Sequence, residues 1–251
     1  MRTYAVINQK GGSGKTTTVV NLAAALGERK KKALVVDLDP QGNASTWYGV
    51  HEEDRGLLNV FQGEENLVNL VRSTGAPGVD LVPSSSWLLG LERRLSGKKG
   101  TETILRRHVL DLPEEWDFVF FDCPPSLGLL TVNALTAVQG LLVPVEAHVL
   151  ALNGLAQLLR TTDMVKEHLN PDLHVSGILA CRVDGRTRHA LEVVDRLRER
   201  FGDLVYKTTI GVNVRLAEAP SFGQPITQYD PRSRGAEDFR SLARELLKGR
   251  R

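Results

Sequence analysis

The amino-acid sequence predicts an α/β fold: a doubly wound, mostly parallel sheet in a single domain, flanked by helices. Two observations lead to this prediction. Short apolar runs rich in β-branched residues alternate with helical patterns along almost the whole chain, an order typical of parallel strands joined by crossover helices. Several of these runs are apolar on both faces, as strands covered by helices on both sides must be.

The expected elements follow one another in the same alternating order from the N-terminus. The expected strands cover residues 3–8, 33–38, 79–82, 118–121, 140–145, 174–180 and 204–209. The expected helices cover residues 16–29, 101–110, 127–138, 152–168, 188–201 and 235–248. Residues 42–71 are the least regular and are predicted to carry a mobile loop. Because the first strand begins at the N-terminus and no long linker divides the chain, we expect one domain over residues 1–251, without a separate N-terminal DNA-reading domain.

The composition excludes several other classes of protein. The 251 residues are 41% hydrophobic and 25% charged, with a mean hydropathy of −0.18, which excludes collagen-like, disordered and multi-span membrane chains. Only Cys123 and Cys181 carry thiols, too few for a disulfide scaffold and typical of a reducing compartment. The sequence has neither a signal-peptide pattern nor an apolar run of about 18 residues. We therefore expect a cytosolic protein.

The strongest functional signal follows the first strand, where residues 8–17 read NQKGGSGKTT. Glycines allow successive backbone N–H groups to surround phosphate oxygens, and the start of the next helix adds its positive dipole. Lys15 can reach the β- and γ-phosphates of a nucleotide, and the Thr16 hydroxyl can bind Mg²⁺. Gln9 stands where the ordinary P-loop has its first glycine, and a second lysine, Lys10, stands at the start of the loop. The strand before and the helix after disfavour the alternative of a glycine-rich turn without a ligand.

Two further strands end in carboxylates. The run ALVVDLDPQGN ends in Asp37 and Asp39, and the run FVFFDCPPSLG ends in Asp122. The carboxyl ends of parallel strands form the edge at which open α/β sheets bind ligands. A carboxylate beside a P-loop suits Mg²⁺ held directly or through water. Taken singly, each aspartate is as often a helix cap or a turn former, but three around one P-loop favour a shared site.

These segments resemble a known family. KGGSGKTT resembles the deviant Walker A box, DLDPQGN its second acidic segment and FFDCPPSLG its Walker B segment. IGVNVRLAEAPSFGQPITQYDPRSRGAEDF is similar to the C-terminal signature of ParA/Soj chromosome-partitioning ATPases. The resemblance covers essentially the whole chain and implies a P-loop NTPase that uses ATP and Mg²⁺. It further implies an ATP-dependent homodimer that binds duplex DNA non-specifically, a ParB-type partner that stimulates hydrolysis, and a cytoplasmic, nucleoid-associated location.

The resemblance also implies roles for individual residues. Lys10 matches the signature lysine that reaches the phosphates of the partner protomer, Lys15 the P-loop lysine, and Asp39 the residue that orients the attacking water. The implied nucleotide-binding residues are Lys10, Gly11, Gly12, Ser13, Gly14, Lys15, Thr16, Thr17 and Asn213. The implied metal residues are Thr16 as ligand, with Asp37 and Asp122 in the outer shell. Two departures stand out: Gly211 and Val212 replace a proline and an arginine near the adenine, and Glu146 replaces a common amide.

Basic residues mark the last third of the chain, which from position 180 onward has 15 basic and 10 acidic residues. Guanidinium groups suit phosphates because their donors fork onto two oxygens. Relatives use the positions matching Arg186 and Arg215 for DNA. The candidate DNA-binding residues are Arg186, Arg188 and Arg215. The alternative is that these arginines lie in solvated loops or pair with Asp184 and Glu192.

Two other functions are compatible with the scaffold. A MinD-like membrane-surface positioning ATPase would need an amphipathic C-terminal helix, and Phe239, Leu242, Leu246 and Leu247 form a short apolar stripe there. Because the stripe is short and interrupted by acids, we expect this helix to dock on the domain, with no membrane partner. An ATP-driven metabolic or metallocluster enzyme is the third candidate. Neither cysteine lies in a glycine-rich ligand loop, which disfavours a shared cluster.

Overall fold

In the computed structural model, which describes residues 1–50, 54–148 and 151–249, the described strands form one sheet in the order β3-β4-β2-β5-β1-β6-β7. All neighbouring strands are parallel except β3, which runs antiparallel to β4. The strands are β1 (Arg2–Val6), β2 (Ala33–Asp37), β3 (Arg72–Ser73), β4 (Val79–Val82), β5 (Phe118–Asp122), β6 (Gly140–Glu146) and β7 (His174–Cys181). The predicted doubly wound, mostly parallel sheet is confirmed.

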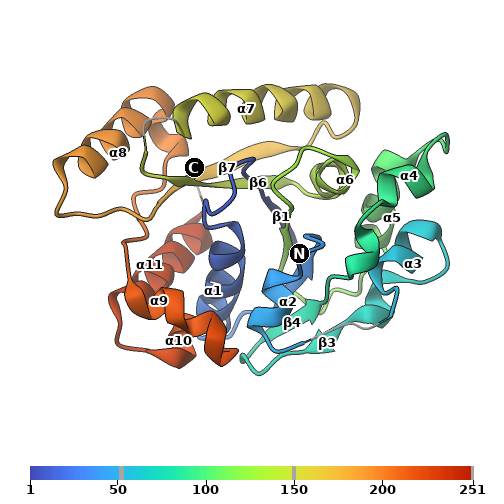
Figure 1. The fold of residues 1–251 in the computed structure, drawn as a ribbon, viewed down its shortest axis with the longest axis horizontal. Coiled ribbons are helices and arrows are strands. Elements are labelled where there is room, and N and C mark those ends of the chain that lie inside the picture. Colours follow the sequence, from blue (N-terminus) through green and yellow to red (C-terminus); the bar gives the residue numbers. More distant parts are fainter. Residues whose placement is uncertain (51–53, 149–150, 250–251) are drawn as a thin grey trace.

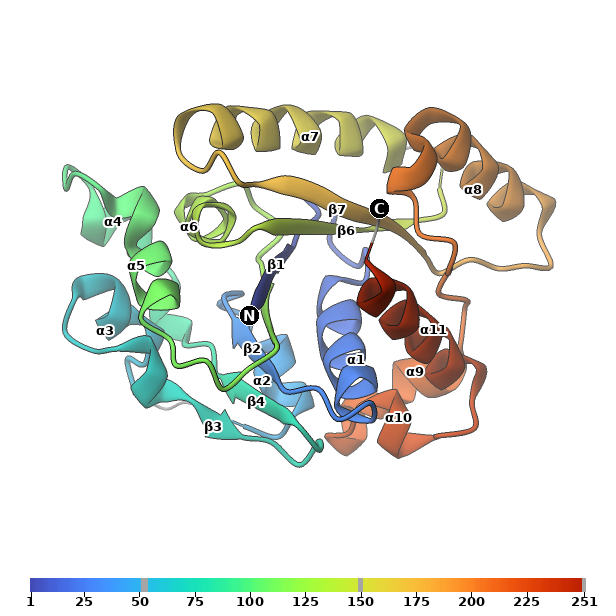
Figure 2. The same ribbon diagram turned by 180° about the vertical axis from the view of Figure 1, so that it is seen from behind.

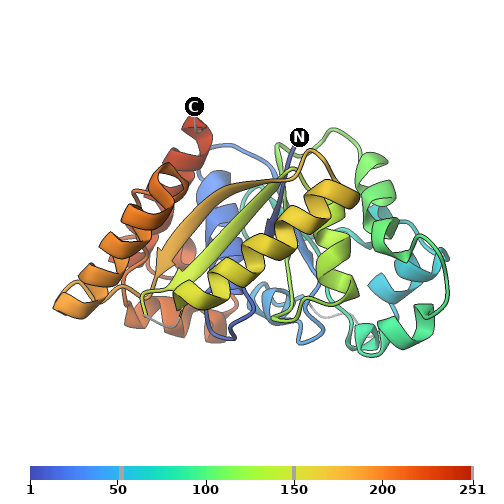
Figure 3. The ribbon, with the colours of Figure 1, turned by 90° about the horizontal axis from the view of Figure 1, so that it is seen from above.

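Helices cover both faces of this sheet (Figures 1 and 2). They are α1 (Lys15–Gly27), α2 (Asn43–Trp47), α3 (Leu57–Gln62), α4 (Leu91–Leu95), α5 (Ile104–Leu110), α6 (Leu129–Ala137), α7 (Ala151–His168), α8 (Arg188–Phe201), α9 (Val214–Glu218), α10 (Ile226–Tyr229) and α11 (Arg234–Lys248). One hydrophobic core joins the sheet to α1, α2, α9, α10 and α11, and a second joins its other face to α3 through α8. Viewed from above, α7 crosses in front of β6 (Figure 3).

Helix α1 is apolar almost all the way round because it is enclosed on two sides. Val19, Leu22 and Leu26 are fully buried, and the helix lies between the sheet and α11. A helix that is apolar on every side is expected only in such an interior position. This packing fixes the first turn of α1, and therefore the loop that precedes it, relative to the ends of the strands.

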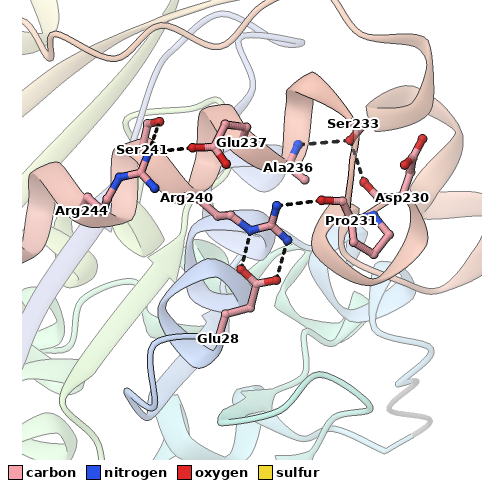
Figure 4. A network of polar contacts seen from close by, with 9 residues as sticks. All are labelled: Glu28, Asp230, Pro231, Ser233, Ala236, Glu237, Arg240, Ser241 and Arg244. Carbon is pink, nitrogen blue, oxygen red and sulfur yellow. Dashed lines mark hydrogen bonds and ion pairs between the residues drawn. The ribbon is translucent and has the colours of Figure 1, made fainter.

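Helix α11 docks on α1 through the apolar stripe seen in the sequence. Phe239, Leu242 and Leu246 are buried in the core shared with α1. At the edge of this contact, Arg240 donates two hydrogen bonds to the Glu28 carboxylate, at 2.7 and 2.8 Å (Figure 4). The face that a membrane-surface helix would need is therefore covered by protein. No helix in the described part of the chain is long and apolar enough to span a membrane.

The prediction of a strand at residues 204–209 is wrong. Only Val205 bridges to β7, next to a short 3₁₀ turn. Beyond it, the N–H groups of Lys207 and Thr208 donate to the two carboxylate oxygens of Glu245 on α11, at 2.8 and 3.0 Å. The Glu245 side chain thus accepts the hydrogen bonds that a neighbouring strand would otherwise accept. Glu245 lies 37 positions beyond Thr208 in the sequence.

Residues 42–71, predicted to be the least regular stretch, contain more regular structure than expected. The segment contains α2, α3 and a 3₁₀ turn over Leu67–Leu70, while residues 51–53, where part of the expected mobile loop falls, lie outside the described residues. Trp47, Leu58 and Phe61 are buried. These elements are too short for helical periodicity to reveal them, and their burial against the sheet stabilises them instead.

Candidate nucleotide-binding site

The loop between β1 and α1 has the backbone of a phosphate cradle. Gly12 and Gly14 have φ angles of 71° and 93°, a left-handed conformation that side-chain-bearing residues rarely adopt. A Cβ added to Gly11 or Gly12 would meet no atom within 4 Å, so the space beside the loop is open. Gly14 forms the cap at which α1 begins. An open loop of glycines at a helix N-terminus favours an anionic ligand.

Beneath this loop, Lys15 faces the carboxylates at the strand ends. Lys15 is only 7% exposed, and burial lowers the pKa of its ammonium, an effect that the charges of Asp122 and Asp39 oppose. Asp122 is fully buried at the end of β5, in register with Asp37 on β2 and Val6 on β1. Burial, reinforced by the nearby Asp37 charge, raises the pKa of Asp122 well above its usual value. The aligned ends of three strands thus bring these groups together.

Asp37 is tied to α2. Its Oδ2 accepts hydrogen bonds from the N–H and hydroxyl of Ser45, at 2.8 and 2.7 Å, and its Oδ1 accepts one from the Asp39 N–H at 3.3 Å. Burial raises the pKa of Asp37 to about 6. The sequence did not identify Ser45 as its partner, because the contact depends on how the chain turns after β2.

Asp39 lies beside the open space rather than beneath it. Its Oδ1 accepts a hydrogen bond from the Gln41 N–H at 3.0 Å, and its backbone carbonyl accepts one from the Ser84 hydroxyl at 2.6 Å. These two bonds fix the turn that follows β2. Asp39 therefore lines the cavity in a defined orientation, whereas Asp37 supports the turn from below.

The loop opens onto a cavity of about 760 Å³, within the size range of ligand pockets. The cavity is lined on one side by the glycines, Lys15, Thr16 and Thr17, and on the other by Trp47, Asn213 and Phe239. Ser13, by contrast, is 1% exposed, and its hydroxyl is buried without a hydrogen-bond partner in the described part of the chain. Most of the predicted nucleotide-binding residues are therefore neighbours around one pocket.

A divalent cation fits the oxygens at Thr16. The Thr16 hydroxyl donates to Asp122 Oδ2 at 2.7 Å, while Asp122 Oδ1 is buried and has no hydrogen-bond partner among the described residues. Mg²⁺ prefers oxygen ligands and keeps several of its waters, which such a carboxylate can accept. The described residues contain no cluster of three or more His, Cys, Asp or Glu side chains able to hold a metal. The Thr16 hydroxyl and Asp122 Oδ1 suit a hydrated divalent cation.

The far side of the cavity is formed by the segment that enters α9. Asn213 caps this helix, because its Oδ1 accepts the Leu216 N–H at 3.0 Å. Gly211 donates its N–H to the Asp238 carboxylate at 3.0 Å. Val183, in the loop after β7, donates to the Ile210 carbonyl at 3.0 Å and accepts from the Val212 N–H at 3.2 Å. Two loops that the sequence analysis treated separately are thus joined by backbone bonds.

Comparisons with known proteins decide the family. A family model described as an AAA domain matches residues 1–175. The chromosome-partitioning ATPase Soj of Thermus thermophilus is 48% identical over 249 residues, covering 98% of this chain and 96% of the relative. The sporulation initiation inhibitor protein Soj of Bacillus subtilis is 43% identical over 244 residues, covering 96% of each. The chain belongs to the ParA/Soj family.

A solved structure supports the same fold for this ParA/Soj family member. Cobyrinic acid a,c-diamide synthase from Mycobacterium smegmatis, solved with a bound ATP analog and magnesium, superposes with a TM-score of 0.86 at 35% identity. The match covers 99% of this chain and 95% of that one. The resemblance inferred from the motifs is confirmed, while the roles of individual residues remain predictions.

The signature lysine of the ParA/Soj pattern lies at the rim of the cavity, away from the buried carboxylates. Lys10 is 51% exposed, and its ammonium contacts Glu146 Oε2 at 2.5 Å. The other oxygen of Glu146 lies 3.7 Å from the Arg182 guanidinium. The hydrogen bond from Lys10 and the charges of Lys10 and Arg182 lower the pKa of Glu146. In the sequence Glu146 stands out only as a departure from the family, and its partners Lys10 and Arg182 become evident only in the fold.

The three predicted DNA-binding arginines are all exposed, and each forms an ion pair with a nearby carboxylate. The pairs are Arg186–Asp184 at 2.9 Å, Arg188–Glu192 at 3.2 Å and Arg215–Glu218 at 3.0 Å. The alternative pairing with Asp184 and Glu192 is therefore present. Exposed ion pairs of this kind contribute little to stability because solvent screens them, so a phosphate can displace the carboxylates at small cost.

Proposed function

We propose that this protein is an ATP-hydrolysing switch whose ATP-bound protomers dimerise and bind duplex DNA without sequence preference, and that it partitions chromosomes or plasmids together with a ParB-type partner. One observation carries the proposal: a glycine cradle, a buried lysine and a cation-compatible threonine–aspartate pair surround one cavity, with a second lysine at its rim. Membership of the ParA/Soj family supports ATP as the nucleotide. Solved relatives with nucleotide and magnesium support the same choice.

Within the cavity, each residue has a distinct task. The glycine backbone and Lys15 bind the phosphates. Thr16 would hold Mg²⁺, supported by Asp122 and, further out, by Asp37. The metal, when bound, neutralises charge that develops on the phosphate oxygens. Asp39, fixed by its bond from Gln41, accepts a hydrogen bond from the attacking water and keeps it in line with the γ-phosphorus. Asn213 borders the base.

Lys10 has a different task because it lies at the rim. Its ammonium is too exposed to serve the buried phosphate site of its own protomer, but it is free to reach across to a second chain. In the proposed dimer it binds the phosphates of the partner's nucleotide, so that dimerisation depends on ATP. Lys10→Ala should therefore bind ATP as a monomer and fail to dimerise, which sedimentation with ATP measures directly.

The proposed non-specific DNA binding uses two arginines that follow two segments joined by backbone hydrogen bonds. Arg186 follows Val183 by three residues, and Arg215 follows Val212 by three; Val183 and Val212 are joined by a backbone bond of 3.2 Å. Guanidinium groups on adjoining loops can bind neighbouring phosphates, and dimerisation doubles their number. Arg188, at the start of α8, adds a third exposed cation two residues beyond Arg186.

The membrane-surface alternative finds no support in the described residues, because the apolar stripe of α11 is buried against α1. A metabolic enzyme on this scaffold would hydrolyse ATP in response to a small substrate and not to DNA. Both alternatives are therefore distinguishable by what the ATP state binds.

The test is binding of the full chain to random-sequence duplex DNA and to anionic vesicles, each with ATP, with ADP and without nucleotide. We expect DNA binding with ATP only, weakening steeply with salt because phosphate contacts release counterions. Binding to vesicles without binding to DNA would replace the proposal with the membrane-surface function. ATP turnover without binding to either would favour the metabolic function.

A further inference from the structure

Glu146 lies at the carboxyl end of β6, between two cations of the cavity rim. Its Oε2 contacts the Lys10 ammonium at 2.5 Å and its Oε1 lies 3.7 Å from the guanidinium of Arg182. The carboxylate is 24% exposed, whereas the two cations are 51% and 64% exposed. The acid is therefore the most buried member of this cluster, and both cations pair with it.

The loop that carries Lys10 is itself anchored to β6. The Asn8 side chain donates to the Pro144 carbonyl at 2.7 Å and accepts the Lys10 N–H at 3.0 Å. Backbone and side chain of Lys10 are thus both held against the same strand of their own protomer. An ammonium in this position cannot reach another chain's phosphates until it leaves Glu146.

Arg182 has an unusual backbone for a residue with a side chain. Its φ angle is 54°, in the left-handed region, which is unfavourable for a non-glycine residue and persists where the surroundings impose it. This conformation holds Arg182 at the cavity wall, within an ion-pair distance of Glu146. When Lys10 departs, Arg182 is the cation already in place to neutralise the half-buried carboxylate.

We propose that Glu146 is a positioning residue that holds Lys10 in its own protomer until an ATP-bound partner competes for the ammonium, and that Arg182 then takes over the carboxylate. This inference rests on the proposed role of Lys10 across the dimer. Glu146 then opposes dimerisation, because each protomer must break its Lys10–Glu146 ion pair before Lys10 can reach the partner's nucleotide. The pair sets how much ATP-bound protein is needed before dimers form.

The variant that tests this is Glu146→Gln, which keeps the size of the side chain and removes its charge. Sedimentation equilibrium with Mg²⁺ and a non-hydrolysable ATP analog should show a dimer that is roughly 2- to 25-fold tighter than the wild type, since two exposed or half-exposed pairs no longer have to be broken. The difference should shrink as salt is raised, because screening weakens the same pairs in the wild type. With ADP, both proteins should remain monomeric.

Two controls separate the charge of Glu146 from other effects. Glu28→Gln makes the same change at the Arg240 pair on the outer end of α1, and it should leave the dimer constant unchanged. Glu146→Asp keeps the charge and should not tighten the dimer as Glu146→Gln does. Equal tightening by all three variants, or none by Glu146→Gln, would overturn the inference.

A parallel measurement on Lys10→Ala distinguishes failure of this inference from failure of the proposed function. If Lys10→Ala still dimerises with the ATP analog, the lysine does not act across the dimer and the proposed function loses that step. If Lys10→Ala is monomeric while Glu146→Gln equals the wild type, the lysine acts as proposed but Glu146 does not hold it back.

Discussion

Lys15 and Lys10 lie five residues apart on one loop, but their surroundings are opposite. Lys15 is 7% exposed above the buried carboxylates of β2 and β5, whose positions follow from the register of the sheet. Lys10 is 51% exposed and is held by one carboxylate at the end of β6. The inner lysine is fixed by packing, and the outer lysine by a bond that can be exchanged.

This contrast separates two kinds of function in one loop. A buried cation can bind phosphates in a constant geometry because nothing competes for its place. A rim cation can change partners because water and other charges reach it. Substitutions at the buried centre should therefore act on nucleotide chemistry, and substitutions at exposed arginines on association only.

The largest effect is expected from Lys15→Ala. It removes the buried cation of the phosphate site, whose charge offsets those of Asp122 and Asp39, so measurable ATP binding should be lost. Calorimetry with ATP and Mg²⁺ checks this, with Lys31→Ala, which removes a surface lysine paired to Asp117, as the control. Unchanged affinity in Lys15→Ala would break the distinction between a buried and an exchangeable lysine.

Asp39→Ala should bind ATP normally and hydrolyse it slowly. Loss of the group that orients the attacking water is expected to lower the single-turnover rate on the order of 100-fold, so that ATP-bound dimers persist. Quenched-flow measurements test the rate. A wild-type rate would move the role to Asp37, despite the three hydrogen bonds that already occupy its carboxylate.

Asp37→Asn tests the buried side of this comparison, because its effect on stability should depend on pH. Burial raises the folded-state pKa of Asp37 to about 6, above the value of about 3.9 in an unfolded chain. Protonated Asp37 therefore contributes to the free energy of unfolding of the wild type. This contribution is fully present below about pH 4 and is lost as the pH rises from about 4 through 6. In nucleotide-free protein, the unfolding free energy of the wild type relative to Asp37→Asn should fall over this interval. Denaturant titrations at pH 4, 5, 6 and 7 measure it, and a constant difference contradicts the shifted pKa.

The smallest effects are expected at the exposed arginines. Arg186→Ala and Arg215→Ala should each weaken DNA binding similarly on every sequence, because phosphates carry no base code. Each should flatten the plot of log K against log salt by about 0.9 per phosphate contact removed, with ATP hydrolysis in the absence of DNA unchanged. Arg244→Ala, which removes a paired arginine on α11, is the matched control. If Arg244→Ala weakens DNA binding as much as the other two variants do, DNA affinity depends on net charge and not on the positions of Arg186 and Arg215.

The parts of this molecule that depend on local pattern could be predicted from sequence. The doubly wound sheet follows from alternating apolar runs, and the cradle at residues 8–17 follows from its glycines and flanking elements. The acidic strand ends were predicted to meet because parallel strands end at one edge. The first two inferences use only neighbours in the chain, and the third adds one general rule of parallel sheets.

The parts that depend on distant partners could not be predicted. Residues 204–209 have strand-like composition, but Glu245 on α11 takes the backbone donors of that segment. Glu146 had no interpretation until the fold brought it to Lys10, 136 positions earlier. The positive φ of Arg182 leaves no signal in composition. Such contacts are set by tertiary packing, which no local pattern contains.

The backbone bonds of Val183 have a thermodynamic consequence. They tie the loop that carries Arg186 to residues 210–212, which line the cavity, and α9, which carries Arg215, begins at Val214. Under the proposed function, an adenine base that orders residues 210–212 also orders the segments that carry Arg186 and Arg215 and bind DNA. Coupling of this kind is reciprocal. If bound ATP raises the affinity for DNA by a certain factor, bound DNA raises the affinity for ATP by the same factor. A nucleoid would then serve as an effector that retains nucleotide, as well as a track.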